Sequence, residues 1–69
     1  MAELTSPLTG KILEINVKVG DVVTEDDELF IIEAMKMENP ITGPAGTIKE
    51  IKVNVGDNVQ KNDVLAIIE

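Results

Sequence analysis

The 69-residue chain contains no cysteine, histidine, tryptophan or tyrosine, and Phe30 is its single aromatic residue. Without thiols or imidazoles it cannot form disulfides, zinc sites built on those ligands, or a histidine general base. Cysteine nucleophiles and histidine-activated serines are excluded for the same reason. No remaining group of residues forms a plausible catalytic set, so we expect a protein that is not itself an enzyme.

Arginine is also missing, and 6 lysines stand against 13 aspartates and glutamates, which gives a net charge of −7. Such a charge repels phosphate backbones and anionic lipids, so neither nucleic acid nor a membrane surface is an expected partner. No run of about 18 apolar residues is present that could span a bilayer. The first residues also lack a basic segment followed by an apolar one. We therefore expect a cytoplasmic protein without direct membrane insertion.

What the chain does contain is an internal duplication. A shift of 36 positions aligns residues 10–33 with residues 46–69, and 14 of the 24 pairs are identical. With a one-residue offset before the first glycine the match extends, which gives two copies of one unit at about 4–33 and 41–69. The segment 34–40 connects them and has no full counterpart.

Each copy has the pattern of β-strands. Ile15, Val17 and Val19 alternate with polar residues, and the second copy repeats this alternation, which predicts a strand with one buried face. Gly20 and Gly56 follow these runs, where a tight turn needs a positive φ. The aspartate after each glycine is expected to bond local backbone amides.

Two short apolar runs, at residues 29–32 and 65–68, predict buried strands. Pro7, Pro40 and Pro44 lack an amide donor, so we expect them at strand ends, edges or turns. No segment shows a sustained helical stripe. The pattern is therefore all-β.

Neither copy is large enough to bury its own apolar face, so the two should share one core in a single domain, residues 1–69. We predict a flattened antiparallel β-sandwich or barrel of two four-stranded halves related by a pseudo-two-fold axis. In that arrangement the connection at 34–40 is a hairpin at one end of the molecule. Both chain termini then lie together at the other end.

Lys36 occupies the middle of this connection, between Met35 and Met37. One interpretation is a solvated turn lysine with two soft apolar neighbours. However, two methionines on an exposed hairpin tip are uncommon unless another protein contacts them. The three residues together therefore favour a recognition site.

The stretch Glu-Ala-Met-Lys-Met-Glu at residues 33–38 resembles the biotin attachment motif of biotin-dependent carboxylases and decarboxylases. The duplicated Val-Gly-Asp turns are also similar to that biotinyl/lipoyl attachment family. The resemblance implies a biotinyl/lipoyl-type barrel and a biotin carboxyl carrier. In such a carrier, biotin moves an activated carboxyl group between biotin carboxylase or decarboxylase and carboxyltransferase active sites.

The family's modified lysine corresponds to Lys36, which would hold biotin through an amide bond. The methionines that a biotin protein ligase reads correspond to Met35 and Met37. The flanking residues of the motif are Glu33, Ala34 and Glu38. Because the two copies align with only a one-residue offset, there is no room for the thumb loop that some members insert. The chain is therefore similar to thumbless carriers.

Two alternatives differ in their chemistry. A lipoyl carrier domain of a 2-oxo acid dehydrogenase-type complex has a similar duplicated fold. Its lysine typically follows aspartate and precedes alanine, whereas methionine stands on both sides of Lys36. The second alternative is a small β module that binds or supports other proteins and carries no prosthetic group.

The remaining charged residues favour plain solvent-facing roles. The acidic run at residues 25–28 could suggest a cation site, since hard metals prefer clustered oxygens. Its counterpart at residues 61–64 reads Lys-Asn-Asp-Val, so we interpret the run as a solvated loop and expect no metal. The lysines that change between copies, and are interpreted as solvent-facing, are Lys11, Lys18, Lys49, Lys52 and Lys61.

Overall fold

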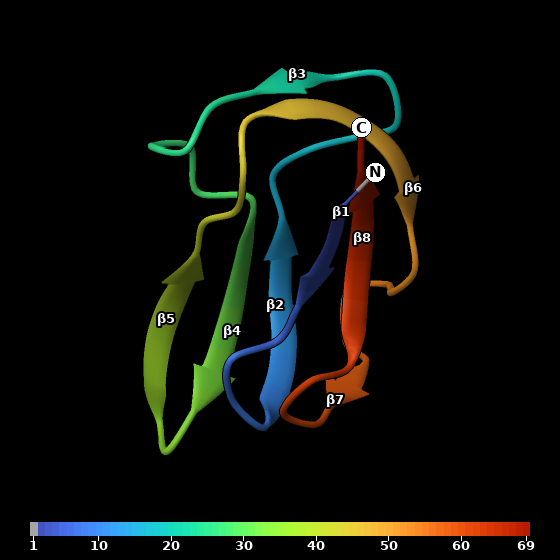
Figure 1. Ribbon diagram of the computed structural model, residues 1–69. Coiled ribbons are helices and arrows are strands. Elements are labelled where there is room, and N and C mark those ends of the chain that lie inside the picture. The colour runs from blue at the N-terminus through green and yellow to red at the C-terminus, as the bar shows by residue number, and fades with distance from the viewer. Residues whose placement is uncertain (1) are drawn as a thin grey trace.

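The computed structural model describes residues 2–69, which form eight β-strands. Figure 1 shows their arrangement. In chain order the strands are β1 (Ala2–Thr5), β2 (Gly10–Ile15), β3 (Val22–Val23), β4 (Phe30–Ala34), β5 (Met37–Ile41), β6 (Gly46–Ile51), β7 (Asn58–Val59) and β8 (Val64–Ile68). No helix among these residues is long and apolar enough to cross a membrane.

The strands form two antiparallel four-stranded sheets, ordered β1-β8-β6-β3 and β5-β4-β2-β7. Replacing each strand of the first sheet by its counterpart in the other copy gives the second sheet, so the predicted pseudo-two-fold symmetry holds strand by strand. Each sheet takes two strands from each copy. The two sequence copies are therefore interleaved and are not the two layers of the sandwich.

The core is built from matched positions of the two copies. Ile12 and Ile48 are both fully buried, as are Leu29 and Leu65. The match is broken at Phe30, whose counterpart is Ala66, and both of these residues are also fully buried. Both residues belong to the same core cluster, so the two copies fill one core with side chains of different volume at this position.

The predicted strand through residues 15–19 is wrong at its far end. Strand β2 stops at Ile15, and the side chain of Val19 is 61% exposed. A β-bulge between Ile12 and Glu14 shifts the register, and the chain then turns, with the Asp21 amide donating to the Lys18 carbonyl oxygen. Pairing continues past the bulge to Ile15, and the turn at residues 18–21 then ends the extended run, which an alternating pattern alone does not reveal.

The glycine–aspartate turns are confirmed. Gly20 and Gly56 have φ values of 98° and 95°. The carboxylate of Asp21 accepts a hydrogen bond from the backbone amide three residues earlier at 3.0 Å, and Asp57 does the same at 2.9 Å. Pro40 lies in β5, an edge strand, where its missing amide breaks no interior ladder.

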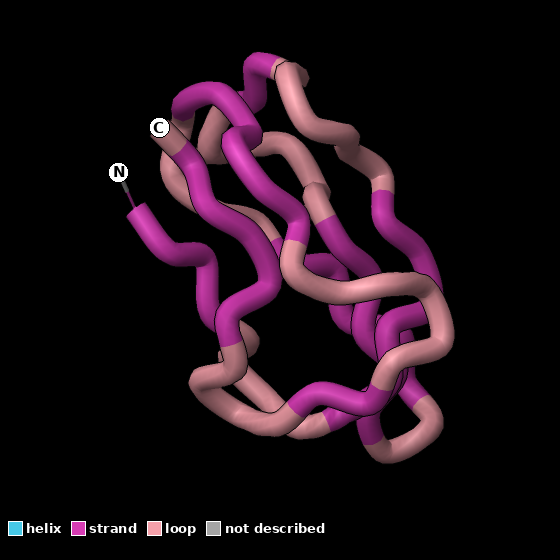
Figure 2. Tube along the Cα trace, turned by 90° about the vertical axis from the view of Figure 1, so that its right-hand side faces the viewer, coloured by secondary structure: helices cyan, strands magenta, loops and turns pink. Residues whose placement is uncertain are grey.

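The two ends of the molecule differ as predicted. Strands β4 and β5 form a hairpin at one end, at the bottom of Figure 1, while Ala2 pairs with Ile68 near the other end. Figure 2 shows the two chain ends beside each other in a second view. The molecule measures 30 × 19 × 17 Å. The connections between the strands of the first copy are residues 6–9, 16–21 and 24–29, and none is longer than six residues, so the described part of this copy has no inserted thumb loop.

Close packing of β2 on β4 requires glycine at position 10. A Cβ on Gly10 would overlap the carbonyl oxygen of Glu33 and lie 2.7 Å from a methyl carbon of Ile32. We predict that Gly10→Ala lowers the free energy of unfolding by about 1–3 kcal/mol, measured by denaturant titration. At Gly20 an added Cβ meets open space, so Gly20→Ala reports the cost of backbone conformation alone. A Gly10→Ala variant as stable as wild type would contradict this packing.

Candidate functional site

The β4–β5 hairpin turns through only two residues. Ala34 pairs with Met37 across the strands, which leaves Met35 and Lys36 as the loop. Their φ values are 53° and 64°. Positive φ at both central residues is the signature of a type I′ turn, whose twist matches that of the flanking strands. The rest of the connection, residues 37–40, belongs to strand β5.

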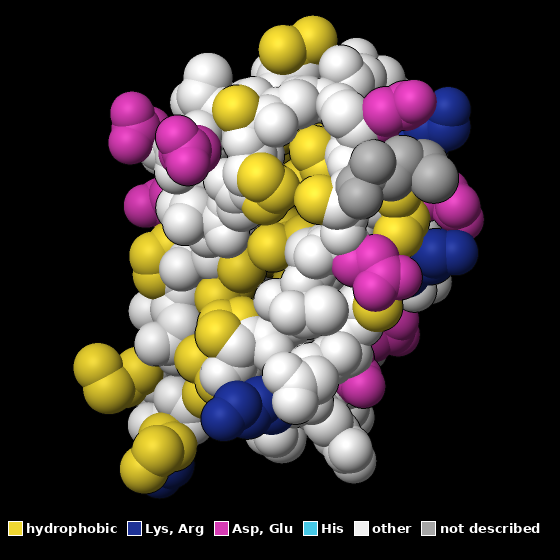
Figure 3. Space-filling view, in the orientation of Figure 1, with side chains coloured by type: hydrophobic (Ala, Val, Ile, Leu, Met, Phe, Trp, Pro, Cys, Tyr) yellow, Lys and Arg dark blue, Asp and Glu magenta, His cyan; other side chains and the backbone are white. Residues whose placement is uncertain are grey.

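The motif residues are concentrated at this tip. Met35 is 94% exposed and Met37 is 66% exposed, and Lys36 is exposed between them. In Figure 3 hydrophobic side chains protrude at the lower left, over the end of β4 and β5. Glu33 and Glu38 are exposed register partners one step below the turn. The structure thus brings all the predicted motif residues to one end of the hairpin, including the half-buried Ala34.

The side chain of Asn39 links the two strands of the hairpin. This residue was not among the predicted site residues. Its side-chain amide donates to the carbonyl oxygen of Ile32 at 3.3 Å and to that of Met37 at 3.1 Å. The available signal was an asparagine inside a strand, where this residue type is depleted. The two bonds tie both strands together just before the turn.

The charges at the tip are solvated. Glu33 and Glu38 pair across the strands one step below the turn, and their side chains and that of Lys36 are exposed. The pKa of Glu69 is lowered, first by its hydrogen bond with Lys49 at 3.0 Å and then by the charge of that lysine. Glu69 is the repeat counterpart of Glu33, yet it lies at the opposite end of the molecule. The tip therefore presents a primary amine that is exposed to solvent.

Other predicted features lie elsewhere. Residues 25–28 form an exposed loop between β3 and β4, and residues 2–69 hold no group of three or more acidic side chains arranged to bind a metal ion. Lys49 and Lys52 form ion pairs with Glu69 and Glu50. Neither the acidic run nor these lysines contribute to the hairpin tip.

Comparison with known families gives one match over nearly the whole chain. The profile of the family described as "Biotin-requiring enzyme" matches residues 2–68. The chain belongs to the biotin-requiring enzyme family. The expected family resemblance is therefore confirmed.

Individual members of the biotin-requiring enzyme family are also similar to the chain. The biotin carboxyl carrier protein of Streptococcus mutans is 53% identical over 45 residues, which are 64% of this chain and 35% of that protein. The gamma subunit of glutaconyl-CoA decarboxylase of Acidaminococcus fermentans is 55% identical over 38 residues, 55% of this chain and 26% of that protein. The matched segments span about a third or less of these relatives.

A solved structure supports the fold of this biotin-requiring enzyme family member. The urea carboxylase of Kluyveromyces lactis contains a region that superposes with a TM-score of 0.89 at 35% identity. The superposition covers 99% of this chain and 6% of that enzyme. The all-β architecture of two four-stranded sheets is confirmed by this agreement.

The turn residues Met35 and Lys36 carry backbone strain that a different sequence would relieve. Type I′ turns prefer asparagine and glycine, because left-handed backbone costs other residues roughly 1–2 kcal/mol. Met35 buries almost none of its side chain, so Met35→Asn loses little packing. We predict that Met35→Asn raises the free energy of unfolding by up to about 1 kcal/mol. Denaturant titration measures the free energy of unfolding. The control is Met37→Asn in strand β5, which should not be stabilised. A Met35→Asn variant no more stable than wild type would contradict the strain.

Proposed function

We propose that the chain is a biotin carboxyl carrier whose biotin is attached by an amide to Lys36. In this role the domain, residues 1–69 with copies at about 4–33 and 41–69, performs no catalysis of its own. When bound, biotin carries an activated carboxyl group. The observation that carries the proposal is the exposed amine of Lys36 at a two-residue turn, between the exposed side chains of Met35 and Met37.

The attachment chemistry requires one step at one atom. The Nζ of Lys36 forms a bond to the carboxyl carbon of biotin, a proton leaves the amine, and AMP departs from the biotinyl adenylate supplied by a biotin protein ligase. Such a reaction needs an amine that a second active site can surround. The tip meets this need, since the motif side chains around Lys36 are exposed.

A carrier works by position more than by chemistry. A lysine side chain extended by biotin forms a long flexible arm, and tethering replaces free diffusion by a high effective concentration at each active site. The hairpin lies at the opposite end of the molecule from the paired residues Ala2 and Ile68. The arm therefore has a free approach that neither chain end obstructs.

The partners follow from the same proposal. A biotin protein ligase would contact Met35 and Met37, with Glu33, Ala34 and Glu38 as flanking contacts. The names of the relatives, a biotin carboxyl carrier protein and a decarboxylase subunit, favour biotin carboxylase and carboxyltransferase or decarboxylase partners. They also favour biotin over the lipoyl alternative, as does methionine on both sides of Lys36.

The direct test compares wild type with Lys36→Arg after incubation with biotin protein ligase, biotin and ATP. We predict a strong streptavidin signal for wild type and none for Lys36→Arg, because arginine keeps the charge but lacks a nucleophilic amine. Circular dichroism checks that both proteins fold. Equal signals from the two proteins, or attachment of lipoate by a lipoate ligase without any attachment of biotin, would overturn the proposal.

The role of Met37 in ligase recognition is tested by Met37→Leu, which changes the shape of the side chain and keeps it apolar. Met37→Leu conserves the apolar volume in strand β5, so the stability should change by less than about 1.5 kcal/mol. We predict that biotinylation of Lys36 slows by roughly tenfold, the equivalent of about 1.4 kcal/mol in the transition state. Time courses of ligation at several protein concentrations measure it. Ligation at the wild-type rate would remove Met37 from the recognition site.

A further inference from the structure

Asn39 is a half-buried polar residue on strand β5, two positions before the buried Ile41. Because alternate residues of a strand share a face, its side chain lies on the same side of the hairpin as that core residue. There its amide donates to the carbonyl oxygen of Ile32 at 3.3 Å and to that of Met37 at 3.1 Å. One side chain thus holds both strands immediately below the turn that carries Lys36.

The duplication shows that strand pairing does not need these two bonds. Asn39 stands opposite Ile32 in the register of β4 and β5. In the copy-related pair, Ala2 stands opposite Ile68, the counterpart of Ile32. Alanine has no side-chain donor, yet β1 pairs with β8 along its length. The β1–β8 pair differs from the hairpin because no tight turn joins its two strands. The bonds of Asn39 therefore support the turn more than the sheet.

The turn has a physical reason to need support. Met35 and Lys36 hold left-handed backbone, with φ values of 53° and 64°. Residues with a Cβ avoid this region, and type I′ turns are normally built from asparagine and glycine. The side chain of Met35 is 94% exposed, so it makes few contacts that could hold the turn in place. The conformation of the tip therefore depends on the strands below it.

We propose that Asn39 is a positioning residue for the biotinylation of Lys36. The inference rests on the proposed function and extends it to a residue outside the motif at 33–38. Met37 directly follows Lys36, so the bond to its carbonyl oxygen fixes the backbone where it leaves the turn. The bond to Ile32 fixes that backbone against β4. Together they keep the amine and the flanking methionines in the single arrangement that the ligase binds.

This role has a kinetic signature. If only a fraction of the free chains has the turn formed, the apparent affinity for the ligase falls in proportion to that fraction. Chains bound to the ligase all have the turn formed, so the rate at saturation does not change. Loss of the two bonds should therefore raise KM and leave kcat unaltered. A general loss of stability changes neither constant while nearly all chains stay folded.

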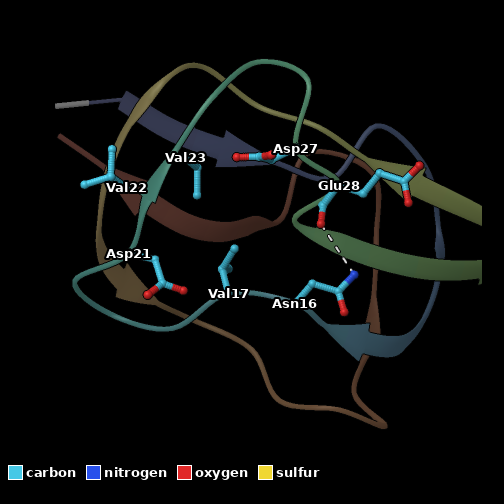
Figure 4. A pocket seen from close by; sticks show the side chains of 7 residues that line it. All are labelled: Asn16, Val17, Asp21, Val22, Val23, Asp27 and Glu28. Carbon is cyan, nitrogen blue, oxygen red and sulfur yellow. Dashed lines mark hydrogen bonds between the residues drawn. The ribbon is translucent and has the colours of Figure 1, made fainter.

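The test compares wild type, Asn39→Ala and Asn16→Ala in ligation by biotin protein ligase. Alanine is the residue that the first copy has at the position of Asn39. Asn16 is the matched control, because its amide also donates to a carbonyl oxygen, that of Glu28 at 3.4 Å, shown as a dashed line in Figure 4. Glu28 precedes β4, whereas the turn follows it. We expect Asn39→Ala to raise KM about fivefold and change kcat by less than about twofold. Asn16→Ala should match wild type.

NMR shows the turn itself, with no ligase present. In the unmodified Asn39→Ala chain, we expect the backbone chemical shifts of residues 34–37 to move toward the values of an unstructured peptide, because the turn opens in part of the population. The shifts of the buried Ile12 and Ile48, in the two sheets, should stay at their wild-type values and show that the core is intact.

A cross-link separates positioning from direct contact with the ligase. Glu33 and Glu38 are register partners one step below the turn, so cysteines at both positions are close enough to form a disulfide. The chain contains no other cysteine. We expect oxidation of Glu33→Cys with Glu38→Cys in the Asn39→Ala background to lower KM to that of the same cysteine pair with Asn39 retained. The reduced form should keep the raised KM.

Three results would overturn the positioning role. Wild-type KM in Asn39→Ala would mean that the turn does not need the two bonds, and a fall in kcat without a change in KM would place the effect in the chemical step. A raised KM that oxidation of the cysteine pair does not lower would make Asn39 a direct ligase contact. If wild type accepts no biotin on Lys36, the proposed function itself fails, and the spectra still decide whether Asn39 holds the turn.

Discussion

The structure depends on the exchange of strands between two copies of one unit, because neither copy can bury its apolar side chains alone. Strand β2 lies between β4 of its own copy and β7 of the other, and β6 lies between β8 and β3 in the same way. The pairs Ile12 with Ile48 and Leu29 with Leu65 thereby form one dry core. Since β4 and β5 are neighbours in one sheet, the link between the copies becomes a tight hairpin, and the chain ends meet at the opposite side.

In that hairpin the backbone adopts a conformation that its residue types disfavour. A type I′ turn is normally made by asparagine and glycine, yet Met35 and Lys36 hold it with positive φ. The ladder from Phe30 to Ile41, the amide of Asn39 and the close approach permitted by Gly10 together enforce the conformation. Local strain enforced by its surroundings is characteristic of functional sites. Here the hairpin presents an amine and two thioethers to solvent.

The sequence predicted more of the topology than of the strand ends. Its duplication indicated the symmetry, the shared core, the position of the hairpin and the termini, and the Gly20 and Gly56 turns. It did not indicate that each sheet mixes both copies, because strand exchange conserves every apolar position. Val19 was placed in a buried strand because an alternating pattern does not reveal the turn at residues 18–21 that follows β2. The role of Asn39 arises from a contact between two strands, its hydrogen bond with the Ile32 carbonyl oxygen, which no local pattern encodes.

One amine among the six lysines of the chain, that of Lys36, lies in a strained and exposed turn. Peptide mapping by mass spectrometry, after exhaustive treatment of the folded wild-type chain with biotin protein ligase, tests this claim most directly. We predict one biotinyl group per chain, found only on the peptide that contains Lys36. Biotin on any of the other five lysines at comparable occupancy, or a chain that stays unmodified while a known carrier is modified beside it, would contradict it.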